Sequence, residues 1–593
     1  MELNTDYKEL NTDYKELNTD YKELKTNYTN ILHNFQYGEN NHIEYKWSDI
    51  NKEKIVQLNF QLVRCNDKSK LNKISNKYFE LLKECDNEEQ ILLIKLLAYT
   101  RDIFMGKGEY KLAHILLIKV IQYNFEIFKK IINLIVGYKT KTSCNTNIIP
   151  YGSWKDVKYL LHEIYNEDIS SIFTLKLKAD SIHYLLNILN NQIKTDIILF
   201  NIKKPISLAA KWVPKEKSKK FGWIFNELAK KFYPSWITTN RKSILKAKTH
   251  YRKVISILNK NLNTTEITLC NKPWNNINFE KVPNYTLFKQ RKAFLNITNN
   301  NSTRRTTEDR ISCSHNFKNY INNLSTIHDK RYSKLTSLGE LVKAAYNSNN
   351  IDEQQVINKL WKQIDKSINI LNNVIPIVDV SASMEQDNEN PINNAIGLGI
   401  KLAENSKYGK KMMTFSTTPQ WINFEDETDI CKIVKKIKNN KETGLNADIH
   451  KVIEQIIDII KSHNVPDTDI ENLTLVILSD MQFDPDISNT LYETSPITNV
   501  IDTKHKLINT STTNTPSCLT PHILFWNLRL TNGFPTLSFT QNVTTLSGYN
   551  PILINYRYVK KDMGVKNITP WLHLCKILNN KRYKELDNIF INS

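Results

Sequence analysis

The spacing of apolar residues divides the chain into two parts with different predicted structure. Over 51–296 apolar residues recur every three or four positions, as in Glu89–Thr100 and Phe125–Gly137, which predicts amphipathic helices. Turn sequences such as MGKGE (105–109) separate these segments. Stacked helical hairpins of the solenoid type are therefore the expected architecture of residues 40–296.

After residue 350 the pattern changes to short apolar runs with helix-like stretches between them. Four runs are typical of buried strands, at 374–380, 411–416, 473–480 and 522–528. Alternating strands and helices predict a mainly parallel, doubly wound sheet. The expected fold class is thus multidomain, with an all-α helical-repeat module followed by an α/β domain.

The domain boundaries follow from these changes in pattern and composition. The helical module is expected over 40–296, an Asn/Thr-rich insertion or connection over 297–350, and the α/β domain with C-terminal helices over 351–593. Residues 1–30 hold tandem copies of ELNTDYK, in which Leu and Tyr alternate by four and three positions. This is heptad spacing, but Asn and Thr are poor helix formers, so the repeat is either coiled-coil-like or disordered.

Charge separates the two parts further and points to a polyanionic partner. The chain carries 81 Lys and Arg against 61 Asp and Glu, a net charge of +20. Residues 201–260 hold 16 basic and 2 acidic residues, whereas 371–490 hold 11 basic and 19 acidic residues. The candidate nucleic-acid contacts are the basic residues of the first stretch: Lys211, Lys215, Lys217, Lys219, Lys220, Arg241, Lys242, Arg252 and Lys253.

Aromatic residues interleave with these lysines and admit two interpretations. Trp212, Phe221 and Trp223 lie among the basic residues. Exposed rings would stack on unpaired bases while the lysines neutralise phosphates. Alternatively, the rings face the helical core and the lysines cover a solvated surface.

Other features of the composition exclude several protein classes. The 8 cysteines are scattered without a C-x2-C pair, which excludes a zinc ribbon and a disulfide framework. The N-terminus lacks the apolar stretch of a signal peptide, and no run approaches 18 apolar residues. We therefore expect an intracellular, cytoplasmic protein with no membrane partner.

Polar residues at the ends of two predicted strands form a candidate metal site. Asp379, Ser381 and Ser383 follow the first strand, and Asp480 ends the strand LVILSD. In an open α/β sheet, ligands bind at the carboxyl ends of the strands. One carboxylate and two hydroxyls offer the oxygen ligands that Mg2+ prefers. The alternative is a Ser-rich turn in which Asp379 caps a helix.

These stretches resemble known families. VDVSASM followed by LVILSDMQF resembles the metal-ion-dependent adhesion site of von Willebrand factor A domains. RDIFMGKGEYKLA (101–113) and YGSWKDVKYLL (151–161) resemble the TROVE module of Ro-type RNA-binding proteins, whose helical repeats are HEAT-like. The layout of residues 40–590 resembles the domain-of-unknown-function 2828 family of plants, fungi and giant DNA viruses. A viral origin would place the protein in the host cytoplasm or the virion.

The resemblance implies further site residues and one departure from the pattern. It implies RNA contacts by Arg101, Lys107 and Trp154 in the helical module. The third metal-site loop usually supplies a Thr, but this sequence has Ala447 there, so Asn446, Asp448 or Thr443 would have to replace it. We therefore expect weakened Mg2+ binding.

Three functions are weighed on these observations. The first is a non-catalytic RNA-binding protein whose A-type domain recruits a protein through Mg2+. The second is a protein-interaction scaffold without nucleic acid, in which the metal engages an acidic partner residue. The third is a metal-dependent hydrolase, for which neither a general base nor a nucleophile is recognisable in the sequence.

Overall fold

The computed structural model describes most of the chain outside the N-terminal heptads. The described residues are 35–138, 149–237, 240–270, 273–324, 337–364, 373–385, 390–416, 418–439, 449–462, 466–483, 521–556 and 568–590. The predicted heptads (1–30) and the third metal-site loop with Thr443, Asn446, Ala447 and Asp448 lie outside them. Among the described residues, no helix is long and apolar enough to cross a membrane.

The described part of the chain from Asn51 to Phe294 folds into helices, as the apolar spacing predicts. The helices are α2 (Asn51–Gln61), α3 (Lys68–Glu84), α4 (Asn87–Arg101), α5 (Tyr110–Tyr123), α6 (Phe125–Val136), α7 (Trp154–Asn166), α8 (Leu175–Asn201), α9 (Ala209–Trp212), α10 (Gly222–Phe232), α11 (Arg241–Leu262), α12 (Thr265–Cys270), α13 (Asn284–Lys289) and α14 (Arg291–Phe294).

Helix α6 illustrates how local sequence sets these boundaries. The Asn124 side chain accepts hydrogen bonds from the backbone N–H groups of Glu126 and Ile127, which caps the first turn. Gly137 ends the helix in the left-handed conformation, with φ at 71°. Between these caps, apolar residues at helical spacing, such as Ile131 and Ile135, are buried in the core.

The segment 297–350, expected to be an insertion or connection, contains two further helices. They are α15 (Glu308–Asn323) and α16 (Leu338–Asn347), and α17 (Ile351–Ile364) follows directly. Phe317 of α15 and Leu341 of α16 are fully buried in the same core as the preceding helices. The Asn/Thr-rich composition of this segment therefore does not indicate α15 and α16, which both contribute to the core.

The carboxyl-terminal part contains one six-stranded sheet flanked by helices. Its strands are β3 (Val374–Asp379), β4 (Lys411–Phe415), β5 (Gln420–Asn423), β6 (Thr474–Ser479), β7 (His522–Asn527) and β8 (Val543–Ser547), and its helices are α18 (Pro391–Glu404), α19 (Ile430–Asn439), α20 (Ile449–Ser462), α21 (Asp467–Asn472) and α24 (Pro570–Leu578). The strand order is β5-β4-β3-β6-β7-β8, and only β5 pairs antiparallel.

The four predicted strands are confirmed and lie side by side, whereas β5 and β8 were not predicted. Successive residues of β6 enter two different cores: Val476 and Leu478 face one, and Leu475 and Ile477 face the other. Both faces of the sheet are covered, which explains the continuous apolar runs. Helix α18 covers one face and α20 packs on the other.

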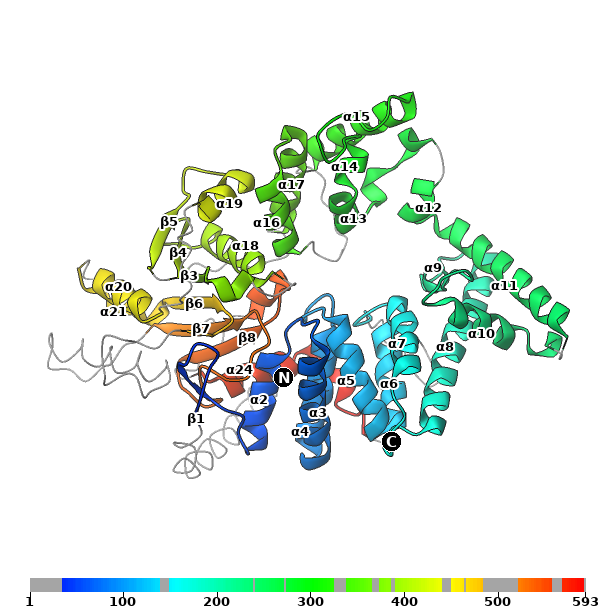
Figure 1. Cartoon of the computed structure of the whole chain (residues 1–593), viewed down its shortest axis with the longest axis horizontal. Helices are drawn as coiled ribbons and strands as arrows, with labels where there is room; N and C mark the ends of the chain where they lie inside the picture. The colour runs from blue at the N-terminus through cyan, green and yellow to red at the C-terminus, as the bar shows by residue number, and fades with distance from the viewer. Residues whose placement is uncertain are drawn as a thin grey trace, which may run out of the picture.

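The helices and the sheet join at both ends of the helical region. Figure 1 shows the helices running in an arc from α2 to α15, after which α16 and α17 return to the sheet. Helix α16 packs on α18, while α2 contacts β8 and α24. Near the C-terminus, Arg582 donates two hydrogen bonds to Asp102 at 2.8 and 3.0 Å. The last described residues thus pack on the first helices.

A short N-terminal hairpin lies against the same sheet domain. Strands β1 (Phe35–Tyr37) and β2 (Ile43–Tyr45) pair antiparallel. Tyr45 also bridges to Phe534, which follows β7. The hairpin therefore connects the beginning of the described chain to the loop after β7.

Helix α18 depends on two glycines, one on each side, and this generates a prediction. A Cβ atom on Gly399 would lie 2.5 Å from Val378 Cγ2 of β3, and one on Gly397 would lie 2.8 Å from Leu338 Cβ of α16. We expect Gly399→Val to lower the free energy of unfolding by about 3 kcal/mol, because it forces α18 off the sheet. Urea unfolding of the full chain measures this change.

The control is Asn319→Val on the exposed surface of α15, which should cost less than about 1 kcal/mol. Equal stability of the two variants would show that α18 has room to move away from the sheet.

Candidate functional site

The D-x-S-x-S sequence brings three oxygen-bearing side chains together at the carboxyl edge of the sheet. Strands β3 and β6 are parallel neighbours with Val378 opposite Leu478, so Asp379 and Ser479 end side by side. Ser479 Oγ donates to Asp379 Oδ2 at 2.6 Å, and the Ser381 backbone N–H donates to Oδ1 at 2.9 Å. The Ser381 and Ser383 hydroxyl oxygens lie 3.0 Å apart.

Asp480, the fourth predicted ligand, is engaged by an arginine that the sequence analysis missed. Arg529 Nε donates to Asp480 Oδ2 at 2.8 Å, and the Gln482 backbone N–H donates to Oδ1 at 3.1 Å. Arg529 Nη2 also donates to Glu39 of the hairpin at 2.7 Å. Asp480 is fully buried, and its negative charge is balanced by Arg529.

Asp379 has no such cation among the described residues. Burial and the nearby charge of Asp480 raise the pKa of Asp379 to about 7. A buried carboxylate beside a second carboxylate is a position that a divalent cation would stabilise.

The residues present fit Mg2+ in their chemistry. One carboxylate and two hydroxyls supply hard oxygen ligands, and Mg2+ tolerates waters in the remaining positions. Within the described ranges, no group of three or more His, Cys, Asp or Glu side chains is arranged to hold a metal. Any metal at this edge would therefore depend on the serine hydroxyls.

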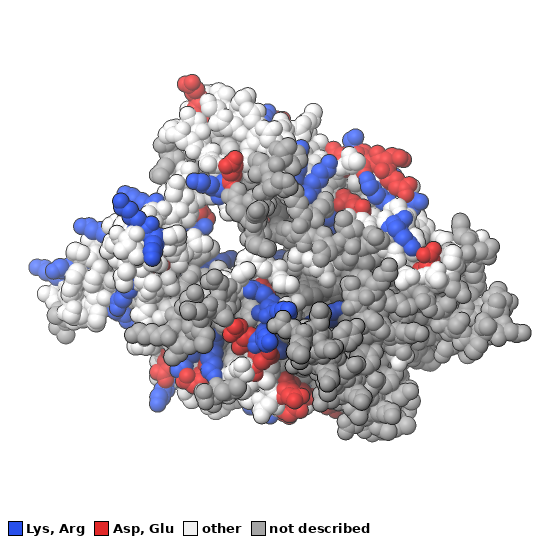
Figure 2. Space-filling view, turned by 180° about the vertical axis from the view of Figure 1, so that it is seen from behind, with Lys and Arg blue, Asp and Glu red and all other residues white. Residues whose placement is uncertain are grey.

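The predicted basic cluster falls into paired and unpaired residues. Lys211 forms an ion pair with Glu266, and Arg252 pairs with Glu216. The second pair joins the segment that follows α9 to the middle of α11. Exposed residues without an ion pair in the described structure are Lys215, Lys217, Lys219, Lys220, Arg241, Lys242 and Lys253. Figure 2 shows Lys and Arg on the lobe formed by α10 and α11, with few carboxylates between them.

Lysines and aromatic rings alternate on a surface beside this cluster. We call it the aromatic–lysine surface, and its members are Tyr110, Lys155, Lys158, Tyr159, Trp212, Lys220 and Phe221. Lys220 is exposed and the others are half-buried, with Trp212 and Phe221 packed on the helical core. Lys155 Nζ lies 4.6 Å from the Tyr110 ring centroid, and Lys158 Nζ lies 4.5 Å from that of Phe221.

The positive charges of this surface lie close enough to act on one another. Burial, together with the positive charges of Lys155 and Lys220, lowers the pKa of Lys158. Within the described structure, none of Lys155, Lys158 and Lys220 forms an ion pair. The rings of Tyr159 and Phe221 meet edge to face at 5.2 Å, so they form one continuous group.

The three residues implied as RNA contacts by the family resemblance are buried instead. The exposed fractions of Arg101, Lys107 and Trp154 are 4%, 2% and 6%, which leaves almost no surface for RNA. Lys107 Nζ donates to the carbonyls of Asn59 and Leu62 and to the Ser547 hydroxyl. It therefore links α2 to β8.

Arg101 belongs to a buried network that the sequence analysis also missed. Arg101 donates two hydrogen bonds to Asp156, at 2.7 and 2.6 Å. His114 Nε2 lies 2.9 Å from the same carboxylate, and Nδ1 lies 2.9 Å from Glu163. Burial opposes protonation of His114, but the charge of Glu163 and the contact with Asp156 outweigh it and raise the pKa of His114 to about 9.

The missed residues differ in how far the sequence could have indicated them. Arg529 follows β7 by two positions, so the predicted sheet places it at the same edge as Asp480. Lys155 and Lys158 lie one turn apart on a predicted helix, which indicates a shared face. Glu39, by contrast, lies 490 positions from Arg529, and nothing in its local sequence indicates that contact.

Comparison with known proteins shows similarity to two families of unknown function and to an uncharacterised viral protein. Residues 168–304 match the family described as "Domain of unknown function (DUF2828)", and residues 373–567 match "Domain of unknown function (DUF7788)". An uncharacterized protein of Acanthamoeba polyphaga mimivirus is 26% identical over 534 residues, covering 86% of this chain and 82% of the relative. The DUF7788 match includes Asp379 and Asp480.

The buried network around His114 predicts a pH dependence of stability. The pKa of His114 in the folded chain, about 9, lies above its ordinary value of 6.5. Its protonation therefore stabilises the fold fully below pH 6.5, and this contribution disappears as the pH rises through 9. We expect His114→Gln to lower the free energy of unfolding by about 2 kcal/mol at pH 6 and to have a smaller effect at pH 10.

Urea unfolding of wild type and variant from pH 6 to 10 measures the difference. His315→Gln, on the exposed side of α15, is the control and should give a constant difference. A pH-independent cost of His114→Gln would mean that only the packing of the ring matters.

Proposed function

We propose that this chain is a non-catalytic RNA-binding protein whose sheet domain recruits a protein partner through Mg2+. The aromatic–lysine surface is the observation that carries the RNA half of the proposal. Its ammonium groups have no carboxylate partners in the described structure, and they lie within reach of the rings of Tyr110, Tyr159 and Phe221. A single-stranded RNA offers both phosphates for the lysines and base faces for the rings.

The exposed lysines of the loop between α9 and α10 extend this surface. Lys215, Lys217 and Lys219 are exposed, and Lys220 Nζ lies 5.3 Å from the Phe221 ring centroid. Neutralising phosphates at several such positions releases counterions, which gives affinity without reading sequence. Recognition of unpaired loops and ends is the mode that this combination supports.

The metal half of the proposal is supported by the cluster at the carboxyl edge of the sheet. Asp379, Ser381 and Ser383 would hold Mg2+, which would neutralise the buried carboxylate and accept an acidic side chain of a partner. Asp480 remains bound to Arg529, so its contribution would be limited to the local electrostatic field. Because Ala447 replaces the usual Thr of the third metal-site loop, we expect Mg2+ binding to be weak in the absence of a partner.

A protein-interaction scaffold without nucleic acid is the second candidate. The observation that favours it is that the hydroxyl–carboxylate cluster lies on the sheet domain and shares no residue with the aromatic–lysine surface. In that case the metal site would act alone, and the lysines would cover a solvated surface. Salt-dependent RNA binding separates the two candidates.

The RNA proposal predicts the behaviour of a quadruple variant. Changing Lys215, Lys217, Lys219 and Lys220 to Gln should weaken binding of a single-stranded RNA. It should also flatten the plot of log affinity against log salt concentration by about 0.7 for each phosphate that the variant no longer neutralises. Filter binding across a salt series measures both quantities.

A matched variant tests whether position matters beyond net charge. Lys68, Lys83, Lys281 and Lys436 are exposed elsewhere, and changing them to Gln removes the same charge. Equal effects of the two quadruple variants, or no RNA binding by wild type, would refute the proposal.

Phe221→Leu should weaken RNA binding by about 1 kcal/mol while leaving the salt slope unchanged, because stacking releases no counterions.

The metal proposal predicts opposite effects of one substitution on stability and binding. Asp379→Asn removes the charge repelled by Asp480, so the metal-free protein should gain about 2 kcal/mol of stability. The same change should abolish the rise in melting temperature that Mg2+ gives wild type. Ala447→Thr should strengthen that rise.

Calorimetry and thermal unfolding with and without Mg2+ measure these effects, with Asn319→Asp on the surface of α15 as a charge-changing control. Absence of any Mg2+ effect on wild type and on Ala447→Thr would remove the metal half of the proposal.

A further inference from the structure

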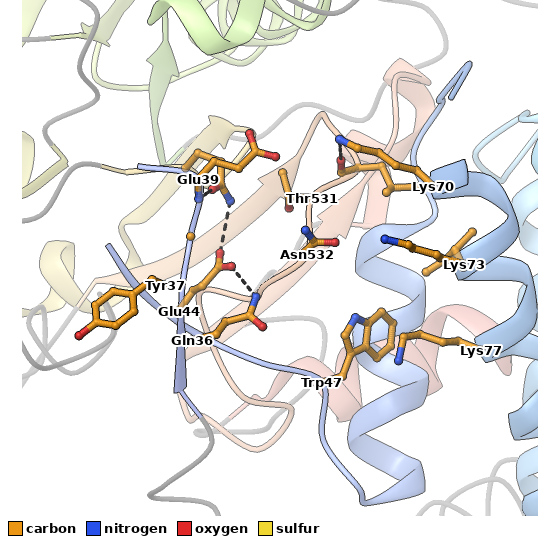
Figure 3. A pocket seen from close by; sticks show the side chains of 14 residues that line it. Gln36, Tyr37, Glu39, Glu44, Trp47, Lys70, Lys73, Lys77, Thr531 and Asn532 are labelled. Carbon is orange, nitrogen blue, oxygen red and sulfur yellow. Dashed lines mark hydrogen bonds between the residues drawn. The ribbon is translucent and has the colours of Figure 1, made fainter. Parts of the chain in front are cut away.

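A cavity lies between the N-terminal hairpin, helix α3 and the loop after β7. Its volume is about 580 Å³, within the range of small-molecule sites. Figure 3 shows lysines from α3 along one side, Gln36, Glu39 and Glu44 on the other, and Thr531 and Asn532 between them. It shares no residue with the aromatic–lysine surface or with the Asp379 cluster.

One wall of this cavity is a row of three amines. Lys70, Lys73 and Lys77 occur at one-turn spacing on α3, so they project from a single helix face. Lys70 Nζ donates to the Leu530 carbonyl at 3.4 Å, and Lys77 Nζ lies 4.3 Å from the Trp47 ring centroid. In the described structure none of the three forms an ion pair with a carboxylate.

The opposite wall consists of hydrogen-bond acceptors fixed by their neighbours. Glu44 is buried, and its carboxylate accepts from Gln36 Nε2 at 2.7 Å and from Gln482 Nε2 at 3.3 Å. Glu39 is fixed by Arg529. The cavity is therefore polarised, with unneutralised cations on one side and carboxylates on the other.

This polarity selects the chemistry of a ligand. A simple anion would use only the lysine wall, and a simple cation only the glutamates. A molecule with phosphates at one end and hydroxyl or amino donors at the other matches both walls at once. Primary amines bind phosphate as point charges, and carboxylates accept hydrogen bonds from sugar hydroxyls or base amines.

We propose that this cavity binds a phosphorylated sugar, such as a nucleoside diphosphate, with its phosphates on Lys70, Lys73 and Lys77. Its hydroxyl or amino groups face Glu44 and Gln36. The site goes beyond the proposed RNA and metal functions, and it needs neither of them to hold.

Calorimetric titration of the full-length chain tests this proposal. The buffer contains EDTA and no RNA, which separates this site from the metal cluster and the RNA surface. The probes are ADP, ribose 5-phosphate, pyrophosphate and adenosine. We expect ADP or ribose 5-phosphate to bind more tightly than pyrophosphate, and adenosine not to bind. The stronger of the first two shows whether a nucleotide or a simple sugar phosphate is preferred.

Two matched variants locate the binding. Lys70→Gln with Lys73→Gln should weaken binding at least about tenfold, since two charge-assisted hydrogen bonds to phosphate are removed. Lys68→Gln with Lys83→Gln, on the same helix but outside the cavity, should change it less than about twofold. Lys73→Gln alone, at an exposed position, should weaken binding by about threefold or more and guards against misfolding of the double variant.

Three outcomes would overturn the proposal. The first is no heat with any probe up to about 1 mM. The second is an equal loss of affinity in the two double variants, which would indicate general attraction of anions. The third is RNA binding that depends on Lys70 and Lys73 without binding of the small probes, which would make this wall part of an RNA surface.

Discussion

The helices and the sheet of this protein are stabilised by one shared hydrophobic core. That core includes Ile55 of the first helices, Val378 of the sheet and Ile589 near the C-terminus. Neither part buries its apolar surface alone, because α2 covers the β8 end and α16 covers α18. Burial of apolar area is the main favourable term in folding, so the two parts are expected to unfold together. The Asp379 cluster and the aromatic–lysine surface are both held in place by this common core.

Charged groups divide into those that hold the fold together and those that remain available. Arg101, Lys107 and Arg529 are buried and donate hydrogen bonds to acceptors from distant segments. Removing one partner of such a pair leaves a buried charge without compensation, which costs several kcal/mol. The lysines of the aromatic–lysine surface and of the α3 wall form no ion pair in the described structure, although Lys70 donates to the Leu530 carbonyl. The net charge of the chain thus says less about function than the pairing of each cation.

The sequence allowed the sheet and part of its site to be predicted, for a local reason. Burial of both faces leaves a continuous apolar run in strands such as 473–480, and a turn of five residues brings Asp379, Ser381 and Ser383 together. The ion pairs of Arg529 with Asp480 and with Glu39 depend on how segments far apart in the chain pack. The burial of Arg101 and Lys107 could not be predicted, because a buried cation that binds distant acceptors has the same local sequence as an exposed one.

The packing of residues 568–590 on the first helices bears on how the gene can vary. The family match over 373–567 ends just before this segment, yet Arg582 and Tyr583 contact Asp102. The C-terminal segment therefore joins α4 to the end of the sheet, because α24 contacts both α4 and β8. Recombination that exchanged the strand-rich region as a unit would therefore have to keep the new β8 complementary to α24, whose other contacts are with the unchanged helices α2 and α4.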